Sequence, residues 1–293
     1  MKVAVLGSNG QLGSDVCAAF LRNGDEIFGL SHSDLELTSA SSIEAALSAC
    51  APELIVNTAA MHHVEKCEAN PMEAFATNAI GAKHVAEWAK RTDAKVIYIS
   101  TDYVFDGKKG IPYLETDVAA PLNAYGVTKL AGEHFTAAIA PKYFVLRVSA
   151  IYGHQPCRAK GGLNFVELML KLSQERDELR VVDDEFITPT PTVQIAAQLV
   201  ALSRSSNYGL YHGTAEGSCS WYEFAAEIFR LTGTRVNLEK ARPGEFPSKV
   251  PRPKYSILEN HALKIARLNV FTDWRDGLKC YLSARAQAVT AAL

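Results

Sequence analysis

The sequence predicts an α/β protein built on a doubly wound, mostly parallel sheet. A short β-rich apolar run, Lys2–Leu6, opens the chain and leads through glycines into a stretch whose apolar residues recur with helical spacing. Similar apolar runs then return along the first half of the chain, at Ile27–Leu30, Leu54–Asn57, Lys95–Ser100 and Tyr143–Val148. Strands that alternate with helices favour a parallel sheet covered on both faces. The length of 293 residues suits one large α/β unit or two lobes.

Composition excludes several classes of protein. Apolar residues make up 48% of the chain and charged residues 21%, which is typical of a packed globular protein rather than a disordered one. The formal net charge is −2 and no basic stripe occurs, so we expect no nucleic-acid partner and no anionic-membrane partner. No signal-peptide pattern or membrane-length apolar run is present, and six scattered cysteines form no C-x-x-C pair. We therefore expect a cytoplasmic protein with free, buried thiols.

A glycine-rich turn follows the first predicted strand. Gly7, Gly10 and Gly13 form a G-x-x-G-x-x-G pattern that ends where the first helical stretch begins. Glycines at this place let the backbone approach a pyrophosphate, and the free N–H groups of the helix start face the anion. A plain tight turn is the alternative. We predict a dinucleotide cofactor here.

The choice between NADPH and NADH stays open. Folds that bind NAD commonly place an acid just past the second strand, and those that bind NADP place an arginine there. The residues after Ile27–Leu30 begin with Ser31 and His32, and the nearest acids follow only at Asp34 and Glu36. His32 could assist a phosphate when protonated, or it could be an ordinary polar loop residue.

Two further features lie between the second and fourth strands. Ala59 and Ala60 follow the third strand and leave room for a flat ligand against the backbone. His62 and His63 come next, but adjacent histidines cannot easily face one ion, so we predict no metal site. A long helix is then marked by apolar spacing, with Asn78 as a polar exception on it.

The pair Tyr125 and Lys129 is the strongest candidate for chemistry. Four residues apart in a predicted helix, they lie one turn above each other on one face. An ammonium beside a phenol favours the phenolate, so we expect a lowered tyrosine pKa and a general acid or base. Ser100 or Thr101 ends the fourth strand, where a hydroxyl could polarise a carbonyl or merely cap a turn. Arg147, inside the fifth strand, either pairs within the sheet or faces a ligand.

The alternation of strands and helices loosens after Ile151. We predict helices at Gly161–Leu172, Val193–Arg204, Trp221–Leu231 and Trp274–Ala284, a strand at Gly209–His212, and a turn-rich segment at Val181–Thr192. Residues 1–150 and about 186–213 would form the dinucleotide-binding domain. Residues about 151–185 and 214–293 would form a smaller, discontinuous substrate-binding lobe.

Two longer motifs carry a resemblance to a known family. STDYVF at Ser100–Phe105 and YGVTKLAGE at Tyr125–Glu133, with the glycine turn, resemble the extended short-chain dehydrogenase/reductase family and, within it, the dTDP-4-dehydrorhamnose reductase branch. NTAAMHHVEKCEANP and RPKYSIL support it, and the likeness runs almost end to end. It implies a Rossmann-type fold and NADPH- or NADH-dependent reduction of the 4-keto group of a nucleotide-linked 6-deoxysugar. The alternatives are an epimerase or dehydratase of the same fold, or a non-catalytic dinucleotide-binding regulatory subunit; a homodimer is possible.

The resemblance also implies a role for each matching residue. Tyr125 would protonate the keto oxygen, Lys129 would lower the tyrosine pKa and hold the nicotinamide ribose, and Thr101 would bond the carbonyl. The implied cofactor contacts are Gly7, Asn9, Gly10, Gln11, Leu12, Gly13, Ser31, His32, Glu36, Leu37, Ala59, Ala60, Met61 and Asn78, together with Tyr125 and Lys129. The implied substrate contacts are Thr101, Asp102, Tyr103, Ala150, Asn164 and Arg252.

Three positions depart from the family pattern. Ala150 stands where the family usually has a tryptophan, which removes a large flat contact. Glu185-Phe186-Ile187 replaces a usual Gln-Phe-Gly, and His32 replaces an arginine often found in the adenosine pocket. All three belong to recognition elements, whereas Thr101, Tyr125 and Lys129 are intact. We therefore predict the same chemistry with some freedom in the substrate. A dehydratase would be expected to carry acidic residues beside the threonine, and here Asp102 is followed by Tyr103.

Overall fold

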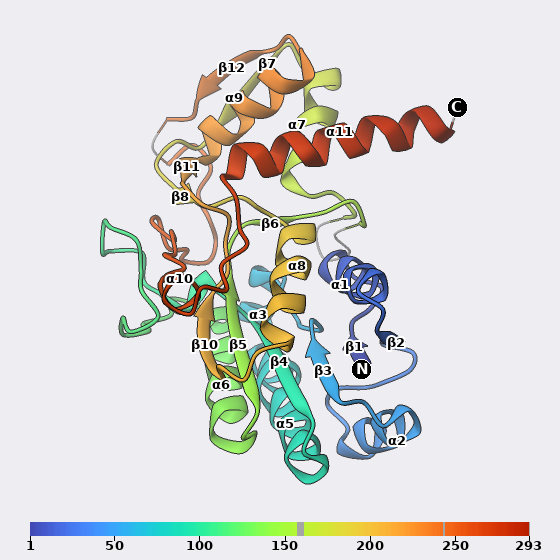
Figure 1. Cartoon of the computed structure of the whole chain (residues 1–293). Helices are drawn as coiled ribbons and strands as arrows, with labels where there is room; N and C mark the ends of the chain where they lie inside the picture. The colour runs from blue at the N-terminus through green and yellow to red at the C-terminus, as the bar shows by residue number, and fades with distance from the viewer. Residues whose placement is uncertain (157–160, 243, 293) are drawn as a thin grey trace.

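The computed structural model describes residues 1–156, 161–242 and 244–292, with side chains to residue 287. Its centre is a six-stranded parallel sheet in the order β10-β5-β4-β3-β1-β2 (Figure 1). The strands are β1 (Lys2–Leu6), β2 (Glu26–Leu30), β3 (Leu54–Asn57), β4 (Lys95–Thr101), β5 (Tyr143–Val148) and β10 (Gly209–His212). The predicted doubly wound α/β fold is confirmed, because every strand predicted for this sheet is present in it.

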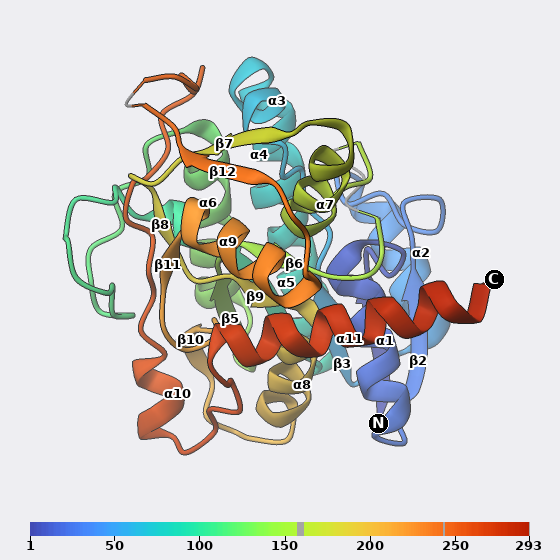
Figure 2. The same ribbon diagram turned by 90° about the horizontal axis from the view of Figure 1, so that it is seen from above.

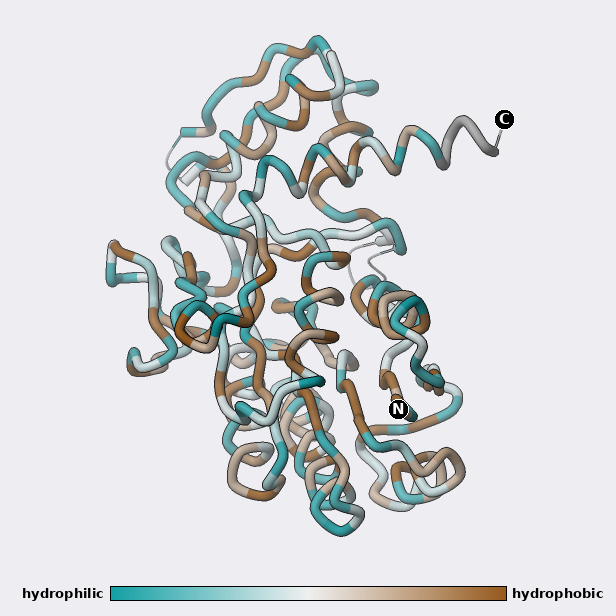
Figure 3. Tube along the Cα trace, viewed as in Figure 1, coloured by the Kyte–Doolittle hydropathy of each residue, from teal (hydrophilic) through white to brown (hydrophobic). Residues whose placement is uncertain are grey.

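Helices cover both faces of the sheet. On one face lie α1 (Gln11–Arg22) and α8 (Thr192–Ser203), and on the other lie α2 (Ala40–Cys50), α5 (Gly81–Thr92) and α6 (Ala124–Ile139) (Figure 1). The strands between them are strongly hydrophobic (Figure 3), since a strand buried on both faces has no polar side to present. Short helices α3 (Val64–Ala69) and α4 (Pro71–Phe75), the π-helix η1 (Ala76–Ile80) and the 3₁₀ turn η2 (Asp102–Val104) complete this part.

A second hydrophobic core lies beyond the carboxyl ends of the strands. Its elements are α7 (Phe165–Glu175), β7 (Glu178–Val181), α9 (Trp221–Thr232), β12 (Asn237–Lys240) and α11 (Trp274–Ala292). Phe224, Trp274 and Tyr152 are buried at its centre. From this lobe α11 runs toward the side of the molecule where α1 and β2 lie (Figures 1 and 2). Short pairs, β6 (Ile151–Tyr152) with β9 (Thr190–Pro191) and β8 (Phe186–Ile187) with β11 (Cys219–Ser220), connect the two cores.

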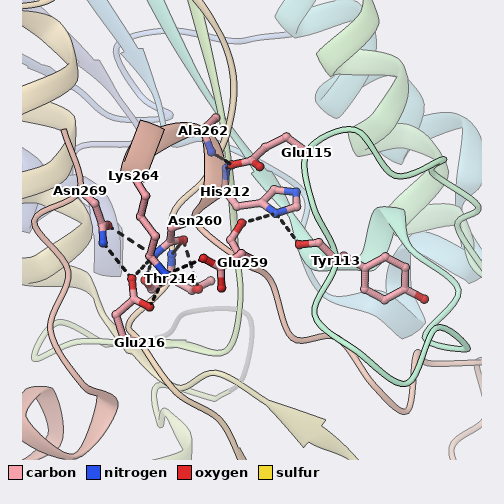
Figure 4. A network of polar contacts seen from close by, with 10 residues as sticks. All are labelled: Tyr113, Glu115, His212, Thr214, Glu216, Glu259, Asn260, Ala262, Lys264 and Asn269. Carbon is pink, nitrogen blue, oxygen red and sulfur yellow. Dashed lines mark hydrogen bonds and ion pairs between the residues drawn. The ribbon is translucent and has the colours of Figure 1, made fainter. Parts of the chain in front are cut away.

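A polar network fixes the loop between η2 and α6. The loop's Tyr113 carbonyl and the Glu259 carbonyl both lie 3.1 Å from the buried His212 Nδ1, and Glu115 accepts the His212 N–H at 3.0 Å (Figure 4). Nearby, Asn260 donates to the Thr214 carbonyl at 2.7 Å, beside α10 (His261–Ile265). The loop is therefore anchored to the edge strand β10.

The structure differs from the predicted elements in a few places. Helix α7 begins at Phe165 rather than at residue 161, because the Asn164 side chain accepts the Glu167 N–H and caps it. The turn-rich segment contains β8 and β9, and the short strands β7, which alternates exposed and buried residues, and β12, which is largely exposed, were not predicted. Cys280 is exposed rather than buried, and Cys157 lies outside the described residues. The domain division stays a prediction. Leu263 and Phe271, near α10, fall in the predicted substrate-binding lobe but pack with the first core.

Candidate active site

The candidate site lies at the carboxyl ends of β1, β3 and β4, where ligands bind in open parallel sheets. The register aligns Leu6 on β1 with Asn57 on β3, and Thr101 on β4 with Val148 on β5. The glycine turn, the loop after β3 and the threonine predicted from sequence therefore meet along one edge of the sheet.

The glycine turn has the geometry of a pyrophosphate cradle. Gly7 adopts a φ of +77°, which favours glycine, and a Cβ at Gly13 would stand 2.1 Å from the Gly7 carbonyl oxygen. Gly10 is the N-cap of α1, and no side chain of the described residues caps that helix start. The first turn of α1 carries no acidic residue either. Its N–H groups are thus available to an anion.

The side chains of Gln11 and Asn78 form hydrogen bonds with the backbone of neighbouring segments. The Gln11 amide donates to the Gly153 and Gln155 carbonyls at 3.3 and 3.1 Å, which ties α1 to the segment after β6. The buried Asn78 accepts the Met61 N–H and donates to the Met61 carbonyl, both at 2.9 Å. It therefore fixes the loop of Ala59–Met61, where the sequence predicted a cofactor contact.

The predicted adenine-side residues form a local turn. Ser31 donates through its hydroxyl to Asp34 at 2.6 Å, and Glu36 accepts the Thr38 N–H at 2.9 Å. His32 is 86% exposed at its side chain, 3.6 Å from a Glu36 oxygen. Leu37 is buried and packs beneath helix α5. This part of the chain leaves the choice between NADPH and NADH open.

Tyr125 and Lys129 lie on one face of α6, as predicted. The helix begins at Ala124 because the Asn123 side chain accepts the Gly126 N–H at 2.9 Å. Gly126 allows close contact with η2, since a Cβ there would lie 2.2 Å from the Tyr103 carbonyl oxygen. The Tyr103 and Tyr125 rings meet edge to face with centroids 5.8 Å apart. These contacts place Tyr125 beside Thr101 at the end of β4.

The expected pKa shift of Tyr125 is wrong in sign. Burial raises the pKa of Tyr125, and a hydrogen bond with the Thr101 side chain offsets only part of that rise. Lys129 is 2% exposed, and desolvation lowers its pKa to about 7. Its Nζ stands 4.0 Å from the centroid of the Tyr98 ring. Sequence spacing brought the two groups together correctly but carried no information on how deeply they are buried.

Asp102 supports Thr101 from within the protein. Its carboxylate accepts the Thr101 hydroxyl at 3.0 Å and the Ser149 hydroxyl at 2.8 Å, and burial raises its pKa. The Thr101 oxygen also accepts the Tyr103 N–H at 3.2 Å. These bonds orient the Thr101 hydroxyl; a direct contact of Asp102 with substrate stays a prediction.

Arg147 pairs within the protein, which decides between the two alternatives left by the sequence. Its guanidinium donates to both Glu133 oxygens, at 2.9 and 2.7 Å, and Ser100 also bonds Glu133. Glu133 and Tyr98 are the residues near the site that sequence reasoning missed. Glu133 had a signal, because it follows Lys129 by four residues on the same helix face.

The predicted substrate-side residues lie where the two cores meet. Ala150 follows β5 with a φ of +43°, and Arg252 forms an ion pair with Glu65 of α3. The Arg252 Nε is buried and has no partner among the described residues. Asn164 caps α7 and donates to the Gly153 carbonyl at 2.8 Å. Their contacts with substrate stay predictions.

Residues 1–156, 161–242 and 244–292 contain neither a metal-binding cluster nor a membrane-spanning helix. No cluster of three histidine, cysteine, aspartate or glutamate side chains is placed to hold a metal ion there. No helix in these ranges is long and apolar enough to cross a bilayer.

The fold and site define a Rossmann-type protein of the short-chain dehydrogenase/reductase class, with its tyrosine and lysine on one helix and a threonine beside them. The RmlD substrate binding domain family matches residues 1–287. The chain is 37% identical to the spore coat polysaccharide biosynthesis protein SpsK of Bacillus subtilis, over 98% of this chain and 99% of that protein. It is 35% identical to the dTDP-4-dehydrorhamnose reductase of Escherichia coli, over 97% of each. The chain belongs to the RmlD substrate binding domain family.

Solved structures agree with this assignment. A dTDP-4-dehydrorhamnose reductase from Clostridium acetobutylicum is 39% identical with a TM-score of 0.93, covering 98% of this chain and 100% of that one. The Bacillus anthracis reductase, solved in complex with NADP, is 35% identical with a TM-score of 0.92, covering 97% and 99%. A UDP-glucose 4-epimerase from Thermus thermophilus is 17% identical, covers 97% of this chain and 98% of that one, and shares the fold with a TM-score of 0.81.

Proposed function

We propose that this protein reduces the 4-keto group of a nucleotide-linked 6-deoxysugar with NADPH or NADH, converting dTDP-4-dehydrorhamnose to dTDP-L-rhamnose. The proposal rests on the placement of Tyr125 against Thr101, one helical turn from Lys129, at the carboxyl ends of the strands. The names of the similar proteins from Escherichia coli and Clostridium acetobutylicum support the substrate.

The cofactor site fits a dinucleotide. The cradle of Gly7 and Gly13 and the uncapped start of α1 suit a pyrophosphate, and the loop held by Asn78 would border the nicotinamide half. NADPH has direct support from the NADP complex of the Bacillus anthracis reductase. When bound, the reduced nicotinamide supplies the hydride that arrives at C4 of the sugar.

The side chains of this protein supply the proton and the electrostatic support. Reduction requires an acid, and the Tyr125 phenol, whose pKa burial raises, carries its proton at neutral pH. Thr101, whose hydroxyl donates to Asp102 in the free protein, would turn that proton to the same oxygen while negative charge develops on it. Donation leaves a phenolate on Tyr125, which a charged Lys129 one turn away would stabilise.

Substrate recognition would fall to the residues where the two cores meet. The partly buried Arg252 offers an Nε donor with no partner in the described ranges, which suits a diphosphate oxygen. Tyr103 lies between Arg252 and Tyr125, and Ala150 leaves space where the family has a tryptophan. We also propose the two-domain division given above and a cytoplasmic location, with a homodimer as the form to test.

The decisive experiment follows NADPH and NADH absorbance separately with purified protein and dTDP-4-dehydro-6-deoxy-L-mannose. Tyr125→Phe should lower kcat by at least about 10²-fold, because the general acid is lost. Tyr143→Phe, at the far end of β5, is the matched control and should keep its activity. Dinucleotide binding without oxidation would favour a regulatory subunit. A nicotinamide that stays bound through purification would favour an epimerase or dehydratase.

A further inference from the structure

A row of three ionisable side chains lies along one face of α6. Tyr125, Lys129 and Glu133 follow each other at intervals of four residues, so they stack on successive turns. Lys129 and Glu133 are 2% and 5% exposed. The row therefore runs from the reacting tyrosine into the interior of the protein.

The inner end of this row is fixed by the sheet. Arg147 on β5 forms two hydrogen bonds with Glu133, and Ser100, its register neighbour on β4, forms a third. Arg147 is 4% exposed, with its guanidinium 5.0 Å from the centroid of the Phe105 ring. A buried ion pair contributes little net stability compared with well-packed apolar residues. A contribution to the stability of the fold is therefore a weak explanation for the buried charges of Glu133 and Arg147.

The middle of the row needs a compensating anion. The Lys129 ammonium stands over the face of Tyr98, whose hydroxyl donates to the Asn78 carbonyl at 2.8 Å and so holds the ring in place. The other groups that face Lys129 are Tyr125 on its own helix and Cys67 on α3. Burial raises the pKa of Cys67 to about 11 and also raises the pKa of Tyr125, so both are uncharged at neutral pH. Glu133 is then the anion that acts on Lys129, with Arg147 behind it.

We propose that Glu133, held by Arg147 and Ser100, is a positioning residue that keeps Lys129 charged beneath Tyr125. The proposal rests on the proposed reductase function for its catalytic meaning, but the charge of Lys129 can be measured without turnover. Desolvation lowers the pKa of Lys129 and the Glu133 charge opposes this fall, and the pKa that results is about 7. At that value, removal of the Glu133 charge decides whether the lysine is charged near neutral pH.

The first test is a pH titration of Lys129 by NMR in protein labelled with ¹³Cε-lysine. The Lys129 resonance is assigned by its absence in Lys129→Met. Glu133→Gln should lower the Lys129 midpoint by about one pH unit or more, the size expected for one buried charge a helical turn away. Glu133→Asp keeps the charge and should recover most of the shift. Glu227→Gln breaks a similar two-bond pair with Arg230 on the exposed surface of α9 and should leave the midpoint unchanged.

A double variant guards against a folding artefact. Glu133→Gln leaves the buried Arg147 charge without its anion, whereas Glu133→Gln with Arg147→Met removes both charges. Both should shift the Lys129 midpoint downward. In the reductase assay, the alkaline limb of the kcat/KM profile should move to lower pH by the same amount, with activity recovered below the new midpoint.

The outcomes separate this proposal from the proposed function. A folded double variant with an unchanged Lys129 midpoint would overturn the role of Glu133, whatever the activity. A shifted midpoint in a protein that oxidises neither NADPH nor NADH would support the role of Glu133 and reject the reductase.

Discussion

Gly132 is the position where a single added methyl group should do the most damage near the site. A Cβ there would stand 2.3 Å from the Tyr98 hydroxyl oxygen and 2.4 Å from the Asn78 carbonyl oxygen. Tyr98 is fully buried, so its ring has no free direction in which to move. Gly132→Ala must therefore separate α6 from η1 or break the hydrogen bond between Tyr98 and Asn78.

The size of the effect follows from three contributions. Overpacking costs about 1–3 kcal/mol, and loss of the Tyr98 hydrogen bond costs about 1 kcal/mol. Alanine gains about 1 kcal/mol over glycine as a helix former, which leaves a net loss of about 1–3 kcal/mol. At about 2.1 cal/mol/K of unfolding entropy for each residue, 293 residues give about 0.6 kcal/mol/K. The expected fall in Tm is thus about 2–5 °C.

Thermal unfolding by circular dichroism measures this, with Gly277→Ala as the matched control. Gly277 is also a glycine within a helix, but its Cβ would meet side-chain atoms of Pro191 and Gln194 at 3.0–3.2 Å. The control should change Tm by less than about 2 °C, because helix propensity offsets a small adjustment. Gly132→Ala should also lower kcat, since Lys129 depends on the Tyr98 ring. A Tm at or above that of the control would refute the packing argument.

Three further predictions follow from the same structure. Gly13→Ala should abolish NADPH binding in a fluorescence titration, because its Cβ would overlap the Gly7 carbonyl; normal affinity would contradict the cradle. Asn78→Ala should raise the Kd for NADPH about tenfold by releasing Met61, and an unchanged Kd would remove that role. Burial lowers the pKa of His212 to about 3, so the unfolded chain alone binds this proton below pH about 6.5. Stability should then fall by up to about 1.4 kcal/mol per pH unit toward pH 3, and His212→Asn should flatten that slope in urea unfolding.

The sequence was sufficient to predict the sheet and to place the candidate catalytic side chains Tyr125 and Lys129 together. Strands buried on both faces read as continuous apolar runs, and β1, β3, β5 and β10 have the predicted bounds. The four-residue spacing of Tyr125 and Lys129 predicts their common helix face without any knowledge of tertiary contacts.

The supports of these residues could not be predicted, because they come from distant parts of the chain. Asn78 lies in η1, a π-helical turn inside the predicted long helix, and it bonds Met61, which precedes it by 17 residues. Arg147 meets Glu133 only after β5 has paired with β4 beneath α6. Neither contact leaves a local pattern of spacing or composition.

The raised pKa of Tyr125, opposite in sign to the predicted shift, bears on the proposed role of this residue as an acid. A lowered pKa would suit a base that accepts the proton of a sugar hydroxyl during oxidation. Burial beside Asp102 and Tyr103 has the opposite effect and keeps the phenol protonated. In the proposed reaction, Lys129, with a pKa of about 7, would act after the proton has left, when a phenolate exists to attract it. The Tyr125 phenol therefore carries its proton at neutral pH, and a charged Lys129 would offset the weaker acidity that burial gives it, as reduction of a keto group requires.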